Sequence, residues 1–385
     1  MIKIESESAL SSNQKRLEFH KKLRGLNLAE GYSYDENKLR PRPYWPTKPV
    51  NNVMACRWTW KELKSVIQES GELVGLGHGQ LNYDRRVIAL TNPGLDDQYA
   101  LTSTFFADFH LIRPGESTPS HRHTPCATRF IFEGKGWTTV GNENVDFSPG
   151  DIIFTGQFPW HDHGNSGQAD LLFLDVLDIP LLQYLGVSLW EFDYETVTGT
   201  RDQHSSPYKI KNYNDVVERR SDARVCGNPR IRNTSDFNYL KWSTTKDLLL
   251  NMNSSEHSLY DGAMIEFTNS QTLKSVGPSM SIFSQMLTPG LKTLEHRHTS
   301  QTIYVGVEGC GIIWFDGQKF EWGPKDIVVV PSWSWHCHEN INGSESSFLH
   351  SISDATLVAK LNLFREQQKT HSGEVVDSFW KSTYF

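Results

Sequence analysis

An internal repeat constrains the fold of this chain more than any other feature of its sequence. The segment at 113–140, RPGESTPSHRHTPCATRFIFEGKGWTTV, matches the segment at 288–315, TPGLKTLEHRHTSQTIYVGVEGCGIIWF, without a gap. The spacing of 175 residues continues into a second cluster, where Trp160, His161, His163 and Asn165 match Trp335, His336, His338 and Asn340. One register held across a whole domain core indicates a duplicated fold.

The pattern inside each copy is that of short β-strands. Runs of β-branched and aromatic residues are separated by turn signals such as Gly141-Asn142, Pro149-Gly150 and Asp316-Gly317. Strands of this length and spacing predict an antiparallel barrel or jelly roll, which closes or doubles the sheet and so protects its edges. We therefore expect an all-β fold of two tandem barrels with peripheral helices.

The helical patterns lie outside the repeat. Residues 14–26 are charged and amphipathic, and at 59–69 we expect Leu63, Val66 and Ile67 to share one apolar face behind a Thr59 cap.

We expect the chain to divide into five parts. These are an N-terminal helical arm with lead-in strands at 1–100, a first barrel at 101–185, a polar and irregular linker at 186–260, a second barrel at 261–363, and a tail at 364–385.

Composition excludes several classes of function. The 385 residues carry 38 Lys and Arg against 45 Asp and Glu, and this net charge of −7 argues against a nucleic-acid or anionic-membrane surface. No apolar run approaches the roughly 18–20 residues that a membrane-spanning helix needs, and the charged N-terminus lacks a secretory signal pattern. The 5 cysteines are scattered without a CxxC pair, so we expect free thiols and a cytoplasmic protein.

The paired histidines carry the chemistry. In a strand, residues i and i+2 point to the same face, so both imidazoles of His121-Arg122-His123 face one way, and His161-Asp162-His163 repeats the pattern. One such pair would be explained as hydrogen-bonded surface histidines. Two pairs in each of two repeats instead predict a metal site, and neutral imidazoles suit Fe, Zn, Cu or Ni rather than Mg or Ca. The candidate ligands are His121, His123 and His161, with a second candidate set of His296, His298 and His336.

Longer motifs around these histidines point to a family. The strings HRHT…RFIFEGKG, WHDHGN, FLDVLDIP and DRRVIALTNPG resemble the gentisate 1,2-dioxygenase family, which also contains salicylate and 1-hydroxy-2-naphthoate dioxygenases. The resemblance covers about 53–180 and the second barrel. It implies a bicupin, a chain of two tandem double-stranded β-helix (jelly-roll) barrels. It also implies an Fe(II) cofactor, an aromatic hydroxy-acid substrate cleaved with O₂ in an extradiol-type reaction, and a homotetramer.

The absence of a glutamate ligand fits this family better than it fits other bicupins. Many cupins place a Glu ligand four or five residues beyond HxH, where this chain has Ala127 and Thr128. Three neutral imidazoles add no negative charge, and they leave about three coordination positions of an octahedral ion for a bidentate substrate and O₂. Oxalate-decarboxylase-type bicupins, which use the Glu, are therefore disfavoured.

The resemblance also implies substrate-binding residues. Arg129, whose counterpart in the second repeat is Tyr304, would bind the substrate carboxylate in a two-pronged fork; the alternative is a surface arginine. Arg85 would face the same pocket, and its neighbour Arg86 would be structural. Phe106 and His110 would line the ring pocket, and because they depart from the residues common in the family they leave the identity of the substrate open.

Two further residues are implied as catalytic. His163 would lie beside the substrate and shuttle protons, with a fourth metal ligand or a core histidine as the alternatives. Asp175 would orient His163, and Asp178 competes for that role or serves only the turn that follows it.

These observations give three competing functions. The first is cleavage of a 2-hydroxybenzoate, with gentisate to maleylpyruvate ahead of salicylate, nitrosalicylate or 1-hydroxy-2-naphthoate. The others are an oxygen-independent metal isomerase or decarboxylase, and a non-catalytic ligand-binding bicupin. Because Tyr304 replaces Arg129, we expect the second barrel not to turn over substrate, whether or not it binds a metal.

Overall fold

The structure is a computed structural model that describes residues 14–15, 17–28, 49–74, 86–95, 98–141, 143–192, 211–212, 223–225, 237–268 and 274–378. The chain divides into two compact units, Met1–Val50 and Asn51–Phe385, and both barrels lie in the second unit. In the first unit, a helix lies within residues 14–25, where the amphipathic pattern predicts one. In the described part of the chain, no helix is long and apolar enough to cross a membrane.

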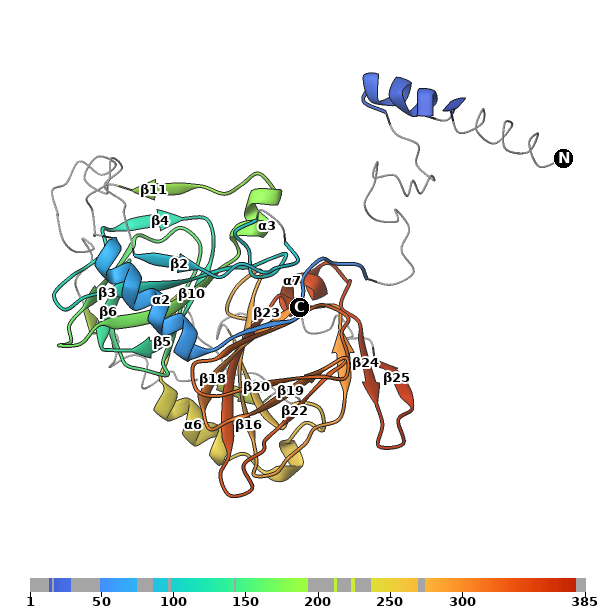
Figure 1. The fold of residues 1–385 in the computed structure, drawn as a ribbon. Helices are drawn as coiled ribbons and strands as arrows, with labels where there is room; N and C mark the ends of the chain where they lie inside the picture. Colours follow the sequence, from blue (N-terminus) through green and yellow to red (C-terminus); the bar gives the residue numbers. More distant parts are fainter. Residues whose placement is uncertain are drawn as a thin grey trace. The chain divides into compact units, whose positions relative to one another are not determined.

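The first barrel, cyan to green in Figure 1, is a jelly roll of two sheets. One sheet has the strand order β14-β8-β5-β10-β3-β2, and the other has the order β11-β4-β9-β6-β7-β12. Its strands are β2 (Val87–Ala89), β3 (Phe106–Ile112), β4 (His121–His123), β5 (Ala127–Glu133), β6 (Gly136–Val140), β7 (Glu143–Phe147), β8 (Ile152–Thr155), β9 (His161–Asn165), β10 (Leu171–Leu177), β11 (Trp190–Phe192), β12 (Lys211–Asn212) and β14 (Phe237–Leu240).

The second barrel, yellow to red in Figure 1, repeats this plan. Its sheets have the orders β1-β21-β18-β23-β16-β15-β13 and β20-β19-β22-β17-β24-β25. Its strands are β1 (Cys56–Trp58), β13 (Ala223–Val225), β15 (Ala263–Phe267), β16 (Ser281–Leu287), β17 (His296–His298), β18 (Thr302–Glu308), β19 (Gly311–Phe315), β20 (Gln318–Trp322), β21 (Ile327–Val330), β22 (His336–Glu339), β23 (Ser347–Ser353), β24 (Glu366–Lys369) and β25 (Val375–Ser378). The predicted all-β bicupin fold is confirmed.

Alternation along the strands creates separate cores. In β5, Ile131 packs inside the first barrel, whereas Phe130 and Phe132 belong to a large cluster that both barrels share. A third cluster fills the second barrel around Tyr304 and Ile313. Burial of each large apolar side chain contributes about 1.5–3 kcal/mol, so the shared cluster holds the two barrels together.

Each barrel is completed by a strand from the segment that precedes the other barrel. β1, which comes before the first barrel in sequence, pairs with β21 of the second, and β14 pairs with β8 of the first. A helix follows each of these two strands, α2 (Trp60–Leu73) after β1 and α6 (Trp242–Leu250) after β14. The first residue of each helix contacts the same barrel as the strand before it. The backbone N–H of Trp60 donates to Asp326 of the second barrel, at 2.7 Å, and that of Trp242 donates to Asp151 of the first, at 2.8 Å.

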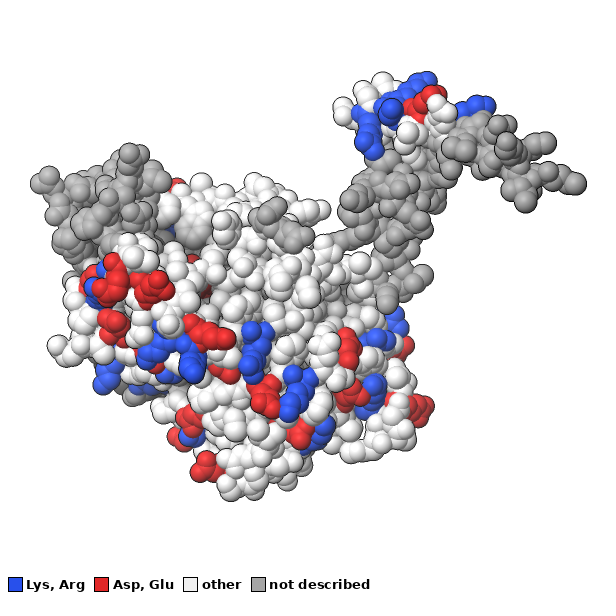
Figure 2. Space-filling view, viewed as in Figure 1, with Lys and Arg blue, Asp and Glu red and all other residues white. Residues whose placement is uncertain are grey.

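Ion pairs reinforce the exchange. Glu133 of the first barrel accepts from Lys64 of α2 and from Lys325 of the second barrel, both at 2.8 Å. Glu308, its counterpart in the repeat, pairs with Lys246 of α6. Positive and negative side chains are accordingly interspersed on the face shown in Figure 2.

Three expectations differ from the structure. The predicted linker at 186–260 is not irregular throughout, because its described parts include β11, β14 and α6, and the predicted tail contains β24 and β25. The pattern places Val66 on the apolar face of its helix, but the structure leaves its side chain 51% exposed. Leu63 and Ile67 are buried as predicted, and the Thr59 side chain caps the helix. Among the described cysteines, Cys56, Cys310 and Cys337 are free.

Candidate metal centre

Three predicted histidines come together on the inner face of the first barrel. His121 and His123 lie on β4, His161 lies directly opposite His121 on β9, and all three are buried. One nitrogen of each ring lies within 4.8 Å of the corresponding atoms of the other two. This spacing allows the three rings to share one metal ion.

Backbone carbonyls fix the tautomers of these imidazoles. The Nδ1 atoms of His121, His123 and His161 lie 3.0, 2.7 and 2.9 Å from the carbonyl oxygens of Pro119, Pro125 and Pro159. A carbonyl oxygen only accepts, so each Nδ1 carries a proton, and the neutral form of each ring would offer the lone pair of its Nε2 to a metal. A neutral imidazole oriented in this way is the usual arrangement of a metal-ligating histidine.

The second predicted triad has a similar arrangement. His296, His298 and His336 also place one ring nitrogen each within 4.8 Å of the others. The Nδ1 atoms of His298 and His336 contact the carbonyl oxygens of Ser300 and Ser334. Burial lowers the pKa of His298 to about 4 and the pKa of His296 and His336 well below the ordinary value, so all three rings are neutral near pH 7.

Charged groups cross the inner face of the first barrel on three adjacent strands. Arg129 on β5 lies opposite Asp175 on β10, which in turn lies opposite Asp108 on β3. The Arg129 side chain is 1% exposed; its Nε lies 3.2 Å from Asp175, and one Nη donates to Thr155 at 2.7 Å. Burial lowers the pKa of Arg129, while Asp175 and Asp108 oppose that shift. The predicted surface alternative for Arg129 is therefore wrong.

His163 lies on β9 beyond His161, and its ring contacts Thr138 on β6. The His163 Nδ1 is 2.6 Å from the Thr138 hydroxyl, which also donates to the carbonyl of Asp162 at 3.0 Å. A hydroxyl has one proton to donate, so it accepts from His163, whose Nε2 then carries a lone pair. The predicted orienting residue, Asp175, forms its ion pair with Arg129. Asp178 lies elsewhere, before α3 (Ile179–Tyr184), and accepts from Cys126 and Ser279.

Aromatic groups line the same inner face. His110 is buried, stacks on Phe173 with ring centroids 4.8 Å apart, and lies 3.3 Å from Asp108. Phe106 is half-buried at the start of β3. These two predicted pocket residues share a face with Asp108, because they alternate along one strand.

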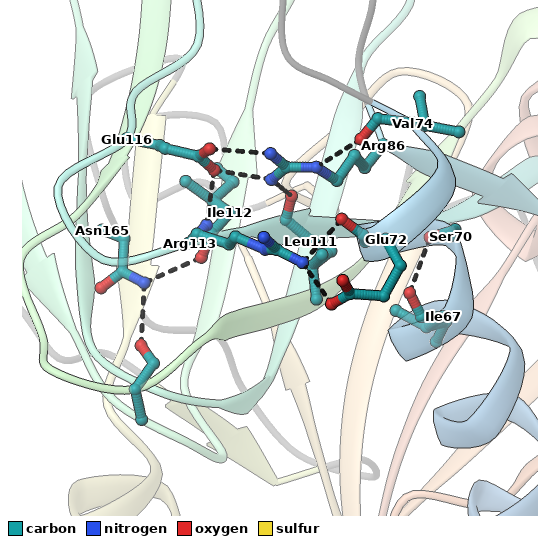
Figure 3. A network of polar contacts seen from close by, with 12 residues as sticks. Ile67, Ser70, Glu72, Val74, Arg86, Leu111, Ile112, Arg113, Glu116 and Asn165 are labelled. Atoms are coloured by element: carbon teal, nitrogen blue, oxygen red, sulfur yellow. Dashed lines mark hydrogen bonds and ion pairs between the residues drawn. The ribbon is translucent and has the colours of Figure 1, made fainter.

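Arg85 lies outside the described residues, whereas its neighbour Arg86 is buried and structural. Both Nη atoms of Arg86 donate to Glu116, at 2.6 and 2.7 Å, and its Nε donates to the carbonyl of Val74 after α2 (Figure 3). Arg113 reaches the C-terminal end of α2 through Gly71 and Glu72 (Figure 3). This network ties α2 to the first barrel.

Sequence reasoning missed two residues beside the first triad. Trp190 and Phe192 lie on β11, directly opposite His123 and His121 of β4. The Trp190 ring is centred 4.3 Å from that of His123, and the Phe192 ring stacks on His121 at 6.2 Å. The alternation of aromatic and charged residues in Trp190-Glu191-Phe192 is a strand signal that could have revealed them.

The second barrel has lost the charged inner face. By strand register, Tyr304 stands for Arg129, Ser351 for Asp175, and Phe283 for Asp108. Ile313 lies opposite His338 in the way that Thr138 lies opposite His163. The two triads therefore have similar histidines in different surroundings.

Comparison with known proteins agrees with this duplication. The cupin domain family matches residues 109–177 and 283–352. A 5-aminosalicylate 1,2-dioxygenase of Comamonas sp. is 29% identical over 90% of this chain and 89% of its own length. A gentisate 1,2-dioxygenase of Aquipseudomonas alcaligenes is 28% identical over 92% of this chain and 97% of its own. A 5-nitrosalicylic acid 1,2-dioxygenase of Bradyrhizobium sp. is 30% identical over 37% of this chain and 68% of its own.

The fold is likewise shared with a solved structure. Salicylate 1,2-dioxygenase of Pseudoaminobacter salicylatoxidans superposes with a TM-score of 0.78 and 24% identity, over 93% of this chain and 94% of that one. The relatives, the duplicated cupin domain and the fold agree with the resemblance read from the motifs. The chain belongs to the gentisate and salicylate 1,2-dioxygenase family of bicupins and is a ring-cleaving oxidoreductase.

Proposed function

We propose that this enzyme is an Fe(II)-dependent dioxygenase that cleaves a 2-hydroxybenzoate, with gentisate, converted to maleylpyruvate, as the first candidate. The observation that carries the proposal is the interior of the first barrel, where one sheet holds a triad of buried imidazoles and the facing sheet holds a buried guanidinium. Salicylate, 5-aminosalicylate and 1-hydroxy-2-naphthoate are the alternatives within the class.

His121, His123 and His161 would hold the iron through their Nε2 atoms. Their tautomers are already set by carbonyl acceptors, so the donor set fits a divalent transition metal without rearrangement. The bound ion would bind O₂ and the substrate together and relay electrons between them. Because the ligands are neutral, the site keeps its positive charge for the anionic oxygens of the substrate.

Arg129 would bind the substrate carboxylate. A guanidinium has five N–H donors, and its contacts with Asp175 and Thr155 use only part of that capacity. The remaining N–H donors suit a carboxylate, because guanidinium groups bind carboxylates through two parallel hydrogen bonds.

His163 would accept the proton of the substrate hydroxyl at Nε2. The Thr138 hydroxyl holds the Nδ1 proton and so keeps the opposite nitrogen basic. Removing that proton from the substrate makes its ring more electron-rich and a better metal ligand.

Aromatic side chains would hold the substrate ring and exclude water. Trp190 and Phe192 line one side next to the triad, and His110, stacked on Phe173, lies on the facing sheet. Apolar walls with a few placed polar groups are typical of small-molecule sites.

The test is an aerobic assay of the iron-reconstituted protein against gentisate, salicylate, 5-aminosalicylate and 1-hydroxy-2-naphthoate. We expect O₂ uptake equal to substrate consumed, and a product heavier than the substrate by two oxygen atoms in mass spectrometry. Matched reactions with the His121→Ala variant should show neither. Conversion without O₂ uptake would support the isomerase or decarboxylase alternative and overturn the proposal. The homotetramer and the cytoplasmic location stay predictions.

A further inference from the structure

A carboxylate lies beside the second histidine triad. Oδ1 of Asp261 is 3.7 Å from Nε2 of His296, and its Oδ2 accepts a hydrogen bond of 3.1 Å from the Ser258 hydroxyl. Asp261 lies two residues before β15, which begins at Ala263. The side chain is 18% exposed, so it is largely withdrawn from water.

The strand next to the second triad is polar where its counterpart is aromatic. On β24, Glu366 lies opposite His298 and Gln368 lies opposite His296. Directly opposed residues share a face of the sheet, so both side chains lie on the triad side, and Gln368 donates to Glu366 at 3.0 Å. Trp190 and Phe192 hold these two positions in the first barrel.

The arginine predicted to bind the substrate carboxylate has no counterpart in the second barrel, where Tyr304 stands for Arg129. The second pocket has therefore exchanged a cation and aromatic rings for carboxylates.

The second triad also contains a lone pair that lacks a partner in the described part of the chain. His336 is 1% exposed, and its Nδ1 donates to the carbonyl of Ser334. Its Nε2 is buried and makes no hydrogen bond with any described residue. Buried polar atoms are nearly always satisfied, and a metal ion between the three rings would satisfy this one.

We propose that the second triad is a separate divalent-metal site, in which Asp261 adds a carboxylate to the three imidazoles, directly or through a metal-bound water, and which excludes carboxylate substrates. One carboxylate lowers the net charge of a divalent site from +2 to +1, and Glu366 beside it lowers the potential further. A mixed nitrogen and oxygen donor set also accepts harder ions, such as Mn²⁺, better than imidazoles alone. This inference does not depend on the proposed function of the first barrel.

The test uses the full chain with the first triad removed, as His121→Ala/His123→Ala. Mn²⁺ titration followed by electron paramagnetic resonance should give one bound ion per chain. Adding Asp261→Asn should weaken Mn²⁺ binding at least tenfold, and Asp261→Glu, which keeps the carboxylate, should restore part of it. Glu345→Gln makes the same charge change on an exposed loop of this barrel and should leave binding unchanged. No Mn²⁺ binding by the parent variant, or equal affinity with and without Asp261→Asn, would overturn the proposal.

A second measurement on the same parent variant tests the exclusion of carboxylates. Salicylate at millimolar concentration should leave the spectrum of the bound Mn²⁺ unchanged. A changed spectrum would show that an anionic ligand enters the second pocket, and the proposal would then be wrong. Neither measurement requires turnover, so a failure here is distinct from a failure of the proposed dioxygenase activity.

Discussion

Arg129 and Asp175 neutralise each other inside the first barrel. Removing either charge should therefore lower the free energy of unfolding. In Arg129→Gln, Asp175 stays buried without its cation, so the free energy of unfolding should fall by about 3–5 kcal/mol. The same variant should keep its iron and lose substrate affinity, with KM raised at least tenfold. Urea unfolding, metal analysis and steady-state kinetics measure the three effects.

The double variant Arg129→Gln/Asp175→Asn separates these effects. Removing both charges should recover much of the stability, because the buried side chain at position 175 no longer carries a charge without its partner, while KM stays high. If KM returned to the wild-type value together with stability, Arg129 would have only a structural role.

Thr138 acts through His163, so its loss should affect turnover and not metal binding. Thr138→Val removes the oxygen that accepts the Nδ1 proton, and we expect kcat to fall about tenfold with iron content unchanged. Thr138→Ser should restore most of the rate. Thr139→Val makes the same chemical change one residue along β6, on the other face, and serves as the matched control. Equal rates for Thr138→Val and Thr139→Val would contradict the positioning role.

Strand register decides which contacts of single residues could be predicted from the sequence. The triads could be predicted because i and i+2 on one strand share a face whatever the partner strand is. The partner of Asp175 could not, because it depends on β10 lying next to β5, and that pairing sets Asp175 opposite Arg129. The role of Thr138 depends in the same way on β6 lying next to β9.

Among the elements, β11 is held next to the first histidine triad by an ion pair on its outer side. Arg122 of β4 contacts Glu191 at 2.5 Å, which directs Trp190 and Phe192 of β11 to the inner side. β11 has only three residues, so its alternation is a weak strand signal, and sequence reasoning places it in an irregular linker. The repeated strands of the barrels could be predicted because each carries several alternating residues between turn signals.

Trp190 should contribute to binding of the substrate ring. In Trp190→Ala the substrate ring loses its contact with an aromatic side chain, which contributes about 1–2 kcal/mol to binding. KM should therefore rise about tenfold, with iron retained. Trp190→Glu, which copies Glu366 of the second barrel, should raise KM further because it repels the carboxylate. Tyr184→Ala removes an aromatic residue that is 90% exposed on α3 and should leave KM unchanged. A wild-type KM in both Trp190 variants would place β11 outside the substrate pocket.

Across the whole second unit, the two barrels depend on each other through matched contacts. Asp178, which precedes α3 of the first barrel, accepts from Ser279 of the second. Asp354, which precedes α7 (Ala355–Lys360) of the second barrel, accepts from Thr104 of the first at 3.0 Å. The gap-free repeat predicts two similar barrels, but it does not show which residues of one copy contact the other, so these contacts could not be predicted from it.

These two buried carboxyls should make stability depend on pH. Burial raises the pKa of Asp178 and of Asp354 from an ordinary value near 4 to about 6. Between pH 4 and pH 6 the unfolded chain has released both protons while the folded chain still holds them. The free energy of unfolding therefore falls as pH rises through this window, by up to about 1.4 kcal/mol per pH unit for each group, and is level outside it.

Asparagine at both positions tests this dependence, because it cannot ionise and keeps the size of the side chain. Urea unfolding of Asp178→Asn/Asp354→Asn at pH 4.5, 5.5 and 6.5 should show a smaller loss of stability with rising pH than the wild type shows. Asp247→Asn changes an exposed carboxyl on α6 and should retain the wild-type slope. If the double variant also kept that slope, the two carboxyls would be ionised in the folded protein throughout this range, and the contacts between the barrels would be insensitive to pH.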